Sequence, residues 1–369
     1  MIHMTVTTRH ASNDYNGTVT MANVGNSQSS EATKAFAPTL ESPYRAMLNA
    51  ELQKILDEHF HNHSLIGNLY YHLRLDTFLD EVTIAHSKRL RGLLCLLIAK
   101  AVGGDIATAV PVACAIELYH NASLILDDIG DSSEERCGRP ALWCKFGVPE
   151  AISAAFLLKV AAELTLTRLA SNDRYYLTAL RELLTTASTM AEGQSRDLQS
   201  QDHWHEGTNY YCQTTRLKTG SLLGTSCALG TVARVSLQKR RLFRSFGTSL
   251  GLAHQIEDDI DDLLTLRGET ARQLDSGNIV YFAASEVGLL GNITQAPKRL
   301  IRLVKEEPGL WVELQQRRVV ARRHLRKRLA QLPDIASEAR ANLCEIANVL
   351  CHRNDAALGE IIQLGKWKG

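Results

Sequence analysis

The sequence predicts a protein built almost entirely of α-helices, on three observations. Long segments rich in Leu and Ala repeat apolar residues at i, i+3, i+4 and i+7, as one face of a helix does, and strand-like alternation is hard to find. Only eight prolines interrupt the 369 residues, so helices can run far without a break. Residues that end or begin helices stand between the apolar segments, at Gly103–Gly104, Gly147–Pro149, Pro308 and Pro111, which we expect to open a helix.

Two regions are expected along the chain. Residues 1–42 are rich in Ser, Thr, Asn and Gly without an apolar period, which is typical of a disordered tail. Residues 43–369 contain no linker of the kind that separates domains, so we expect one all-α domain there. The basic stretch from Lys298 to Arg328 is expected to form solvated C-terminal helices, because acidic residues are interspersed with its bases.

The composition excludes several classes of protein. There are 41 Lys and Arg residues and 40 Asp and Glu residues, and this balance argues against a protein that binds nucleic acid through a general basic field. No stretch approaches about 18 uninterrupted apolar residues, so we expect no transmembrane segment. The eight cysteines are scattered without a CxxC pair, which favours reduced thiols in a cytoplasmic protein over a disulfide framework or a zinc site.

Two clusters of carboxylates follow apolar helical segments. In the first, Asp127 and Asp131 lie one turn apart on one face of a helix, with Asp128 on the adjoining flank. The second, about 130 residues later, repeats this i, i+4 geometry at Asp258 and Asp262. A solvated acidic helix end is the alternative, but two copies weaken it, because unpaired carboxylates one turn apart repel each other and need a counter-charge. Mg²⁺ suits them, since it takes one or two carboxylates and completes its shell with water and phosphate oxygens.

Further motifs accompany these clusters in order along the chain. They are Ser87-Lys88-Arg89-Leu90-Arg91, Arg136-Cys137-Gly138-Arg139-Pro140, Gly193-Gln194-Ser195-Arg196-Asp197-Leu198, Lys218-Thr219-Gly220 and Gln255-Ile256-Glu257-Asp258-Asp259. With the two aspartate clusters they resemble the GKRxRP, RRGxP, GQxxDL, KTA and FQIxDD motifs of the trans-isoprenyl diphosphate synthases, the polyprenyl synthetase family. The resemblance runs from about residue 43 to about residue 290 and points to short-chain, geranylgeranyl diphosphate synthase-like members. It implies an isoprenoid synthase-type helical bundle around a central active-site cavity.

The resemblance also implies a reaction. In such enzymes an allylic diphosphate ionises, and the double bond of isopentenyl diphosphate attacks the allyl cation. Metal ions and cationic side chains aimed at the leaving diphosphate stabilise the charge that develops there. The chain is therefore expected to be a Mg²⁺-dependent prenyltransferase that makes a short-chain prenyl diphosphate, with C20 the best guess, and to form a homodimer.

Residue roles follow from the same resemblance. Asp127 and Asp131 are expected to bind two Mg²⁺ ions and Asp258 a third. Arg136, Lys218 and Thr219 are expected to contact the allylic diphosphate, and Gln255 is expected near the reacting carbons. Asp128, Asp259 and Asp262 are expected to assist catalysis from behind these residues. The positions expected to bind isopentenyl diphosphate without metal are Lys88, Arg91 and His120.

Residues on the helix before the first cluster bear on product length. Ser123 and Ala122 stand four and five positions before Asp127, and their small side chains leave room for a growing prenyl chain. Tyr119, two turns before Asp127, is expected to form a deeper floor. This arrangement favours a product longer than C15.

Three departures from the family pattern leave alternatives open. Cys137 replaces the second arginine after the first cluster, and a thiol cannot make the bidentate contact of a guanidinium. Asn278 stands where a later lysine is expected, with Arg267 or Arg272 as possible substitutes, and Gly92 replaces a proline. Since these changes touch the second substrate, the main alternative is a class I terpene cyclase, which ionises an allylic diphosphate without isopentenyl diphosphate. A prenyltransferase with a non-isoprenoid acceptor and a non-catalytic partner subunit are further alternatives.

Overall fold

A computed structural model describes most of the chain from Pro43 onward. The described residues are 43–76, 89–169, 173–231, 234–265, 276–289, 307–333 and 335–351. The predicted tail and Lys88 lie outside them. So do residues 266–275, which follow the second aspartate cluster and include Arg267 and Arg272. The boundary expected at residue 43 stays a prediction.

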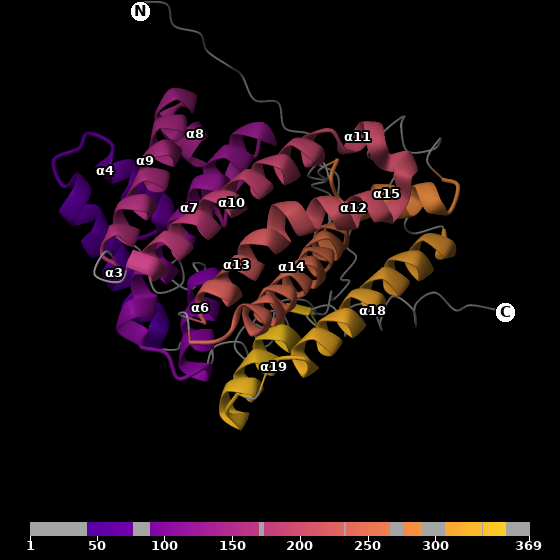
Figure 1. The fold of residues 1–369 in the computed structure, drawn as a ribbon. Coiled ribbons are helices and arrows are strands. Elements are labelled where there is room, and N and C mark those ends of the chain that lie inside the picture. Colours follow the sequence, from indigo (N-terminus) through magenta and orange to yellow (C-terminus); the bar gives the residue numbers. More distant parts are fainter. Residues whose placement is uncertain are drawn as a thin grey trace, which may run out of the picture. The chain divides into compact units, whose positions relative to one another are not determined.

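Helices dominate the described residues, as predicted (Figure 1). In chain order the elements are α3 (Pro43–Phe60), α4 (Ile66–Leu73), α6 (Leu90–Ala101), α7 (Ile106–Gly130), β1 (Glu135–Arg136), β2 (Arg139–Pro140), α8 (Leu142–Phe146), α9 (Val148–Thr167), α10 (Asp173–Leu198), α11 (Ser200–His203), the 3-10 helix η2 (Trp204–Glu206), α12 (Gly207–Thr215), the π-helix η3 (Arg216–Gly220), α13 (Ser221–Leu229), α14 (Leu237–Thr265), α15 (Ile279–Glu286), α18 (Pro308–Ala330) and α19 (Ser337–Cys351). Among these residues the strands are two residues each, and they form one antiparallel hairpin in which Arg136 pairs with Arg139. The all-α prediction is confirmed.

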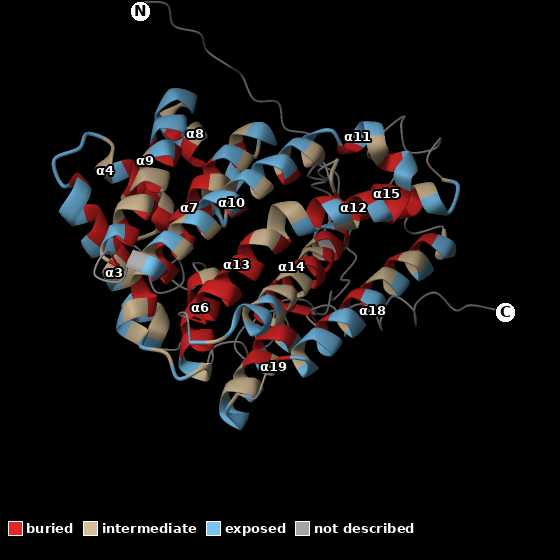
Figure 2. Cartoon of the chain, in the orientation of Figure 1, coloured by how far each residue is buried: buried red, intermediate tan, exposed pale blue. Residues whose placement is uncertain are grey.

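Two groups of helices carry the packing. The first is built on α7, which contacts α6, α9 and α10, and the second on α14, which contacts α13, α18 and α19 (Figure 1). Figure 2 shows α6 and α13 buried along most of their length, whereas α9, α10 and α18 keep exposed outer faces. The apolar spacing that predicted helices is therefore the spacing of the faces turned to the core.

The helix that carries the first aspartate cluster begins earlier than expected. Its N-cap is Asp105, whose carboxylate accepts hydrogen bonds from the backbone N–H groups of Ala107 and Thr108 at 3.2 and 3.1 Å. Pro111 lies inside α7, so the prediction that it opens a helix is wrong. Asp105 satisfies two of the N–H groups that a helix start leaves unpaired, so the helix begins there. Pro111 lies in the second turn, where it removes one backbone hydrogen bond and crowds the carbonyl of Ala107.

The same helix is long and apolar enough to cross a membrane by length and composition, and it is the one described helix of which this holds. Of its most apolar 18-residue stretch, 72% is buried within the bundle, which is typical of a core helix.

All eight cysteines are free thiols, four of them buried, as the scattered spacing predicted. The absence of a transmembrane segment and the cytoplasmic location stay predictions.

Glycines allow α10, η3 and α14 to pack closely at the Lys218-Thr219-Gly220 motif. A Cβ on Gly193 of α10 would stand 2.4 Å from the backbone nitrogen of Lys218, and one on Gly251 of α14 would stand 2.7 Å from the Cα of Gly220. Only residues without a Cβ permit such contacts. The π-helix η3 is therefore held between α10 and α14, and π-helical turns are frequent at functional sites.

The basic C-terminal helix is not simply solvated, which corrects the expectation for residues 298–328 in their described part. Arg318 and Arg322 of α18 donate to the carboxylate of Glu257 on α14, with Nε and Nη2 of Arg318 at 2.7 and 3.0 Å. The side chains of Glu257 and Arg318 are 1% and 4% exposed. A buried carboxylate needs such partners, because removing one of them typically costs several kcal/mol.

Candidate active site

A cavity of about 1160 Å³ lies where the helices that bear the two aspartate clusters approach each other. Its wall is formed by α4, α6, α7, α9, α10, η3 and α14 and by the β1–β2 hairpin. The predicted site residues on this wall are Arg91, Tyr119, His120, Ala122, Ser123, Asp127, Asp131, Arg136, Lys218, Thr219, Gln255 and Asp258. The structure thus brings together side chains from segments more than 160 residues apart in the chain.

The acidic part of the cavity combines both clusters. Asp127 and Asp131 come from the end of α7, and Asp258 and Asp262 come from α14. Enclosure by the cavity wall raises the pKa of the Asp127 carboxyl, and the nearby carboxylates of Asp197 and Asp128 add to this. A bound cation would stabilise the charged form of such a group.

The residues fit a hard divalent cation. No three His, Cys, Asp or Glu side chains in the described part of the chain come close enough to hold a metal ion by themselves. Mg²⁺ does not need such a cage, since one or two carboxylates with water and phosphate oxygens complete its octahedron. The oxygen donors of Asp127, Asp131 and Asp258 are of the required kind.

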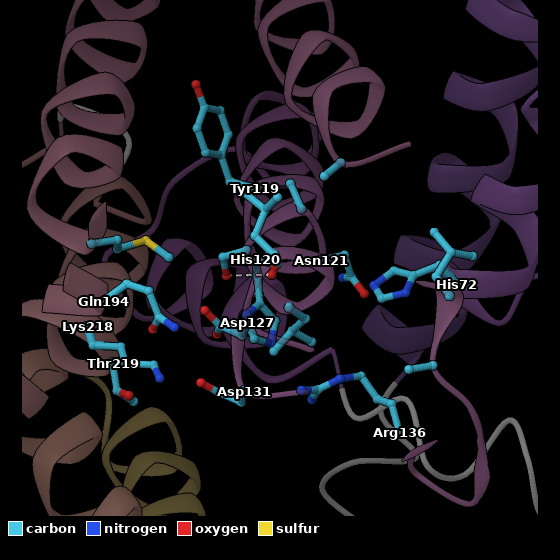
Figure 3. Close-up of a pocket in the computed structure, with 18 of the residues that line it drawn as sticks. His72, Tyr119, His120, Asn121, Asp127, Asp131, Arg136, Gln194, Lys218 and Thr219 are labelled. Atoms are coloured by element: carbon cyan, nitrogen blue, oxygen red, sulfur yellow. Dashed lines mark hydrogen bonds between the residues drawn. The ribbon is translucent and has the colours of Figure 1, made fainter. Parts of the chain in front are cut away.

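Two cations flank the first cluster, Lys218 on one side and Arg136 on the other (Figure 3). Lys218 Nζ donates to Asp197 Oδ2 at 2.6 Å. Burial alone would lower the pKa of Lys218, but the carboxylates of Asp197 and Asp127 outweigh it and raise this pKa above its ordinary value. The lysine is therefore a fixed positive charge beside the aspartates.

Asp128 does not line the cavity but holds a residue that does. Its carboxylate accepts two bonds at 2.8 Å from Arg136 Nε and one at 2.6 Å from Nη2. The Asp128 side chain is 1% exposed and that of Arg136 is 33% exposed. This bidentate pair fixes the plane of the guanidinium while leaving its other edge toward the cavity.

Asp259, expected in an auxiliary role, also lies outside the cavity wall, whereas Asp262 lies on it. Its carboxylate accepts from the backbone N–H of Ile279 at the start of α15 and from Gln255 Nε2, both at 2.9 Å. Burial raises the pKa of Asp259 to about 8. Since Gln255 Oε1 in turn accepts from Thr219 Oγ1 at 3.1 Å, Asp259 acts on the cavity through the orientation of Gln255.

Asn278, which replaces an expected lysine, is a structural residue. Its Oδ1 caps α15 by accepting from the backbone N–H of Val280 at 3.0 Å, and its Nδ2 donates to the carbonyl of Asp259 at 3.1 Å. The residue is 4% exposed and is not on the cavity wall. Among the described residues, no cationic side chain replaces the expected lysine beside Asn278.

The basic part of the cavity lies around the start of α6. Arg91 Nη1 and His120 Nε2 are 2.7 Å apart. Burial and then the charge of Arg91 hold the pKa of His120 well below its usual range. The pKa of His72, on the same wall, is also lowered, to about 3, mainly by burial and in addition by the charge of Arg136. Both imidazoles are thus neutral beside the guanidinium groups.

The cavity ends at a tyrosine on α7. The Tyr119 hydroxyl donates to Glu163 Oε1 on α9 at 2.9 Å, and Lys159 Nζ reaches the same oxygen at 2.6 Å. Tyr119 is 6% exposed, and Ala122 and Ser123 lie between it and the aspartates on the wall. A carboxylate from α9 thus fixes the orientation of Tyr119, and its role as the floor stays a prediction.

The substitution of a proline by Gly92 has a local reason. The backbone N–H of Gly92 donates to Oε1 of the buried Glu117 at 2.7 Å, and a Cβ at this position would stand 2.9 Å from Glu117 Cγ. A proline has no N–H to donate and would crowd this carboxylate. The glycine is therefore matched to Glu117.

Several cavity residues were not predicted. They are His72, Arg74, Arg89, Arg139, Gln194 and His254. Gln194 and Arg89 belong to motifs of the family pattern, so their place in the sequence already indicates a position near the site. No pattern marked Arg74, which reaches the site because α4 ends beside the hairpin.

Known proteins resemble this chain in sequence and in fold. A family model described as polyprenyl synthetase matches residues 72–275, more than half of the chain. The chain is 33% identical over 185 residues to a short chain isoprenyl diphosphate synthase of Methanocaldococcus jannaschii, covering 50% of this chain and 56% of that protein. It is 35% identical over 184 residues to a geranylgeranyl diphosphate synthase of Mycobacterium tuberculosis, covering 49% and 52%.

These matches span about half the length of each curated relative. A solved structure of a geranylgeranyl pyrophosphate synthetase from Geoglobus acetivorans extends the likeness of the fold. It superposes with a TM-score of 0.67 at 25% identity, over 84% of this chain and 98% of that one. The isoprenoid synthase-type bundle predicted from the motifs is confirmed.

The Asp128–Arg136 pair makes a prediction about stability. We expect Arg136→Gln to lower the free energy of unfolding by about 3 kcal/mol, because it leaves a buried carboxylate without its partner. The double variant Asp128→Asn/Arg136→Gln should lose much less, since no charge remains buried. Urea unfolding measures both, with Lys54→Gln as the control that breaks an exposed pair and should change stability by less than about 1 kcal/mol. Additive losses in the double variant would contradict this prediction.

Proposed function

The chain belongs to the polyprenyl synthetase family, and on that premise we propose that it is a prenyltransferase. Its substrates would be an allylic diphosphate and isopentenyl diphosphate, and its product a short-chain prenyl diphosphate. One observation carries the proposal: two carboxylate clusters and a separate basic group line the same cavity. Two diphosphates can therefore bind close together, one through metal ions and one through cationic side chains.

The acidic part would hold the allylic diphosphate. Asp127 and Asp131 from one side and Asp258 from the other would hold Mg²⁺, three ions in all. When bound, Mg²⁺ neutralises the diphosphate and makes it a better leaving group. Lys218 and Arg136 are already fixed by carboxylates outside the wall, so they can take up charge on the leaving oxygens without rearranging.

The basic part would hold isopentenyl diphosphate. Arg91 Nη1 donates to His120 Nε2 on the wall, and a neutral His120 accepts this bond without repelling the guanidinium. Retention of this pair supports chain elongation over the alternative, a class I terpene cyclase. Lys88, expected here from its motif, lies outside the described residues.

The apolar end of the cavity would hold the growing prenyl chain. Tyr119 lies eight residues before Asp127 on α7, about 12 Å along the helix axis. Small side chains at Ala122 and Ser123 leave the intervening layer open. This supports a product longer than C15, and we propose C20.

A product assay tests the proposed reaction. Purified protein with Mg²⁺ is given geranyl, farnesyl or geranylgeranyl diphosphate, each with and without isopentenyl diphosphate. We expect a longer prenyl alcohol after phosphatase treatment only when isopentenyl diphosphate is present. A cyclic hydrocarbon formed without isopentenyl diphosphate would instead establish the cyclase.

Carboxylate variants test the metal assignment. Asp127→Asn and Asp258→Asn should each lower the rate of diphosphate release from the allylic substrate by at least about 100-fold, because developing charge loses its counter-ion. Asp202→Asn, on the exposed face of α11, is the matched control and should release diphosphate at the wild-type rate. Wild-type release by either site variant would rule out metal binding by that residue.

The floor of the cavity makes a prediction about product length. Tyr119→Ala should shift the main product toward longer chains, because the ring no longer closes the end of the cavity. Tyr119→Phe keeps the ring and loses only the bond to Glu163, so it should retain the wild-type product. Chromatography of the dephosphorylated products distinguishes the two variants, and an unchanged product in Tyr119→Ala would place the floor elsewhere.

We also propose a homodimer, on apolar side chains left exposed by two neighbouring helices. Ile152 and Phe156 of α9, which also line the cavity, and Leu177 and Leu184 of α10 are 51%, 64%, 60% and 42% exposed. Leu177→Glu, outside the cavity, should shift the protein toward monomer in sedimentation velocity, whereas Val319→Glu on α18 should leave the distribution unchanged. A dimer that withstands Leu177→Glu would place the interface elsewhere.

A further inference from the structure

Cys137 lies at the tip of the β1–β2 hairpin, and an arginine from another element reaches it there. This arginine, Arg74, follows the last residue of α4. Its Nη2 donates to the carbonyl oxygens of Arg136 and Cys137 at 2.8 and 2.9 Å. A guanidinium group thus lies beside the position where the family's second arginine is missing.

The backbone at Arg74 would suit glycine better. Arg74 is the C-cap of α4, with φ 55° and ψ 46°, in the left-handed region. Helices commonly end with glycine in this conformation, since a side chain there is strained. The capping bonds to the carbonyls of Tyr70 and Tyr71 use only the backbone N–H of residue 74, so the helix end has no need of the arginine side chain.

Buried donors without protein partners gather on the same wall. Arg74 Nη1 and Arg91 Nε have no hydrogen-bond partner in the part of the chain that the structure describes, and both residues line the cavity. A buried donor left without an acceptor is costly, and a charged one more so. An anion with several oxygens has acceptors for both arginines.

Neighbouring carboxylates are already engaged. Asp76 accepts from Arg139 Nη2 at 2.8 Å, and Asp128 accepts from Arg136. The carboxylate of Glu117 accepts from the backbone N–H of Gly92. Arg136 and Arg139 are thus paired with carboxylates behind the wall. Arg74, Arg89 and Arg91 also line the cavity, and the carboxylate of Glu117 is the acid among them. This part of the wall can therefore accept an anion.

We infer that Arg74 supplies, from the end of α4, the guanidinium missing at Cys137, and that it binds the diphosphate of isopentenyl diphosphate together with Arg91. This assignment rests on the proposed function. Nη2 is used to hold the hairpin carbonyls, and Nη1 is left for a phosphate oxygen. A guanidinium group serves both tasks at once because its donors point along fixed, separate directions.

Equilibrium binding of isopentenyl diphosphate tests this inference. Without an allylic substrate no turnover occurs, so calorimetry gives a dissociation constant directly. Arg74→Gly removes the guanidinium and suits the left-handed backbone, and it should weaken binding about tenfold or more. Arg340→Ala removes another guanidinium that donates to a carbonyl, that of Leu329 at 3.0 Å, and should leave the constant unchanged.

A second substitution separates substrate binding from support of the hairpin. In Arg74→Gly/Cys137→Arg the guanidinium returns on the hairpin itself, and affinity should recover to within about threefold of wild type. The affinity for farnesyl diphosphate with Mg²⁺ should stay within twofold in all variants. Wild-type affinity in Arg74→Gly, or equal loss of both substrates without recovery, would overturn the inference.

The same titrations separate this inference from the proposed function. If the wild-type protein elongates prenyl chains while Arg74→Gly binds isopentenyl diphosphate normally, the Arg74 assignment fails and the function stands. If it does not elongate but binds inorganic diphosphate in a manner lost in Arg74→Gly, the function fails and the anion site stands. Binding of neither diphosphate by the wild-type protein would overturn both.

Discussion

The buried ion pair between Glu257 and Arg318 sets the direction in which α14 presents its aspartates. Successive residues of a helix point about 100° apart, so holding Glu257 against α18 turns Asp258 and Asp262 toward the cavity. Arg322 donates to the same carboxylate and reinforces this orientation. Rotation of α14 would leave a buried charge unpaired, which is among the costlier changes a protein interior can undergo. The acidic part of the site thus depends on contacts made on the far side of the helix.

Charge is divided within the cavity so that two anions need not share a counter-charge. Asp127, whose pKa is raised by its enclosure, and Asp258 gather on one part of the wall and suit metal ions. Arg91 lies elsewhere on the wall, beside imidazoles held neutral by burial and by nearby guanidinium groups. Neutral His72 and His120 add hydrogen-bond donors without adding repulsion. Two diphosphates can then approach each other while each keeps its own partners.

The sequence predicted the fold and the charged residues of the aspartate and basic motifs on the cavity wall, because helix periodicity and motif order are local properties of the chain. It did not predict the partners of the auxiliary aspartates: Asp128 holds Arg136, and Asp259 holds the start of α15. Such orientation depends on partners far away in sequence. The start of α7 depends on the side-chain cap of Asp105, and Pro111 inside the helix gives no local sign of it. No local pattern relates Arg74, at the end of α4, to the hairpin that it contacts.

The departures from the family pattern are of two physical kinds. Asn278 and Gly92 make hydrogen bonds within the bundle, so these two positions have a structural role in this chain. Cys137 differs, because donors remain buried around it without partners among the described residues, on Arg74 and Arg91. A cyclase that binds a single diphosphate at the aspartates would leave these donors unsatisfied throughout its reaction, at a cost of about 1–3 kcal/mol each. Under the proposed function, the diphosphate of isopentenyl diphosphate is a second anion that would satisfy these donors.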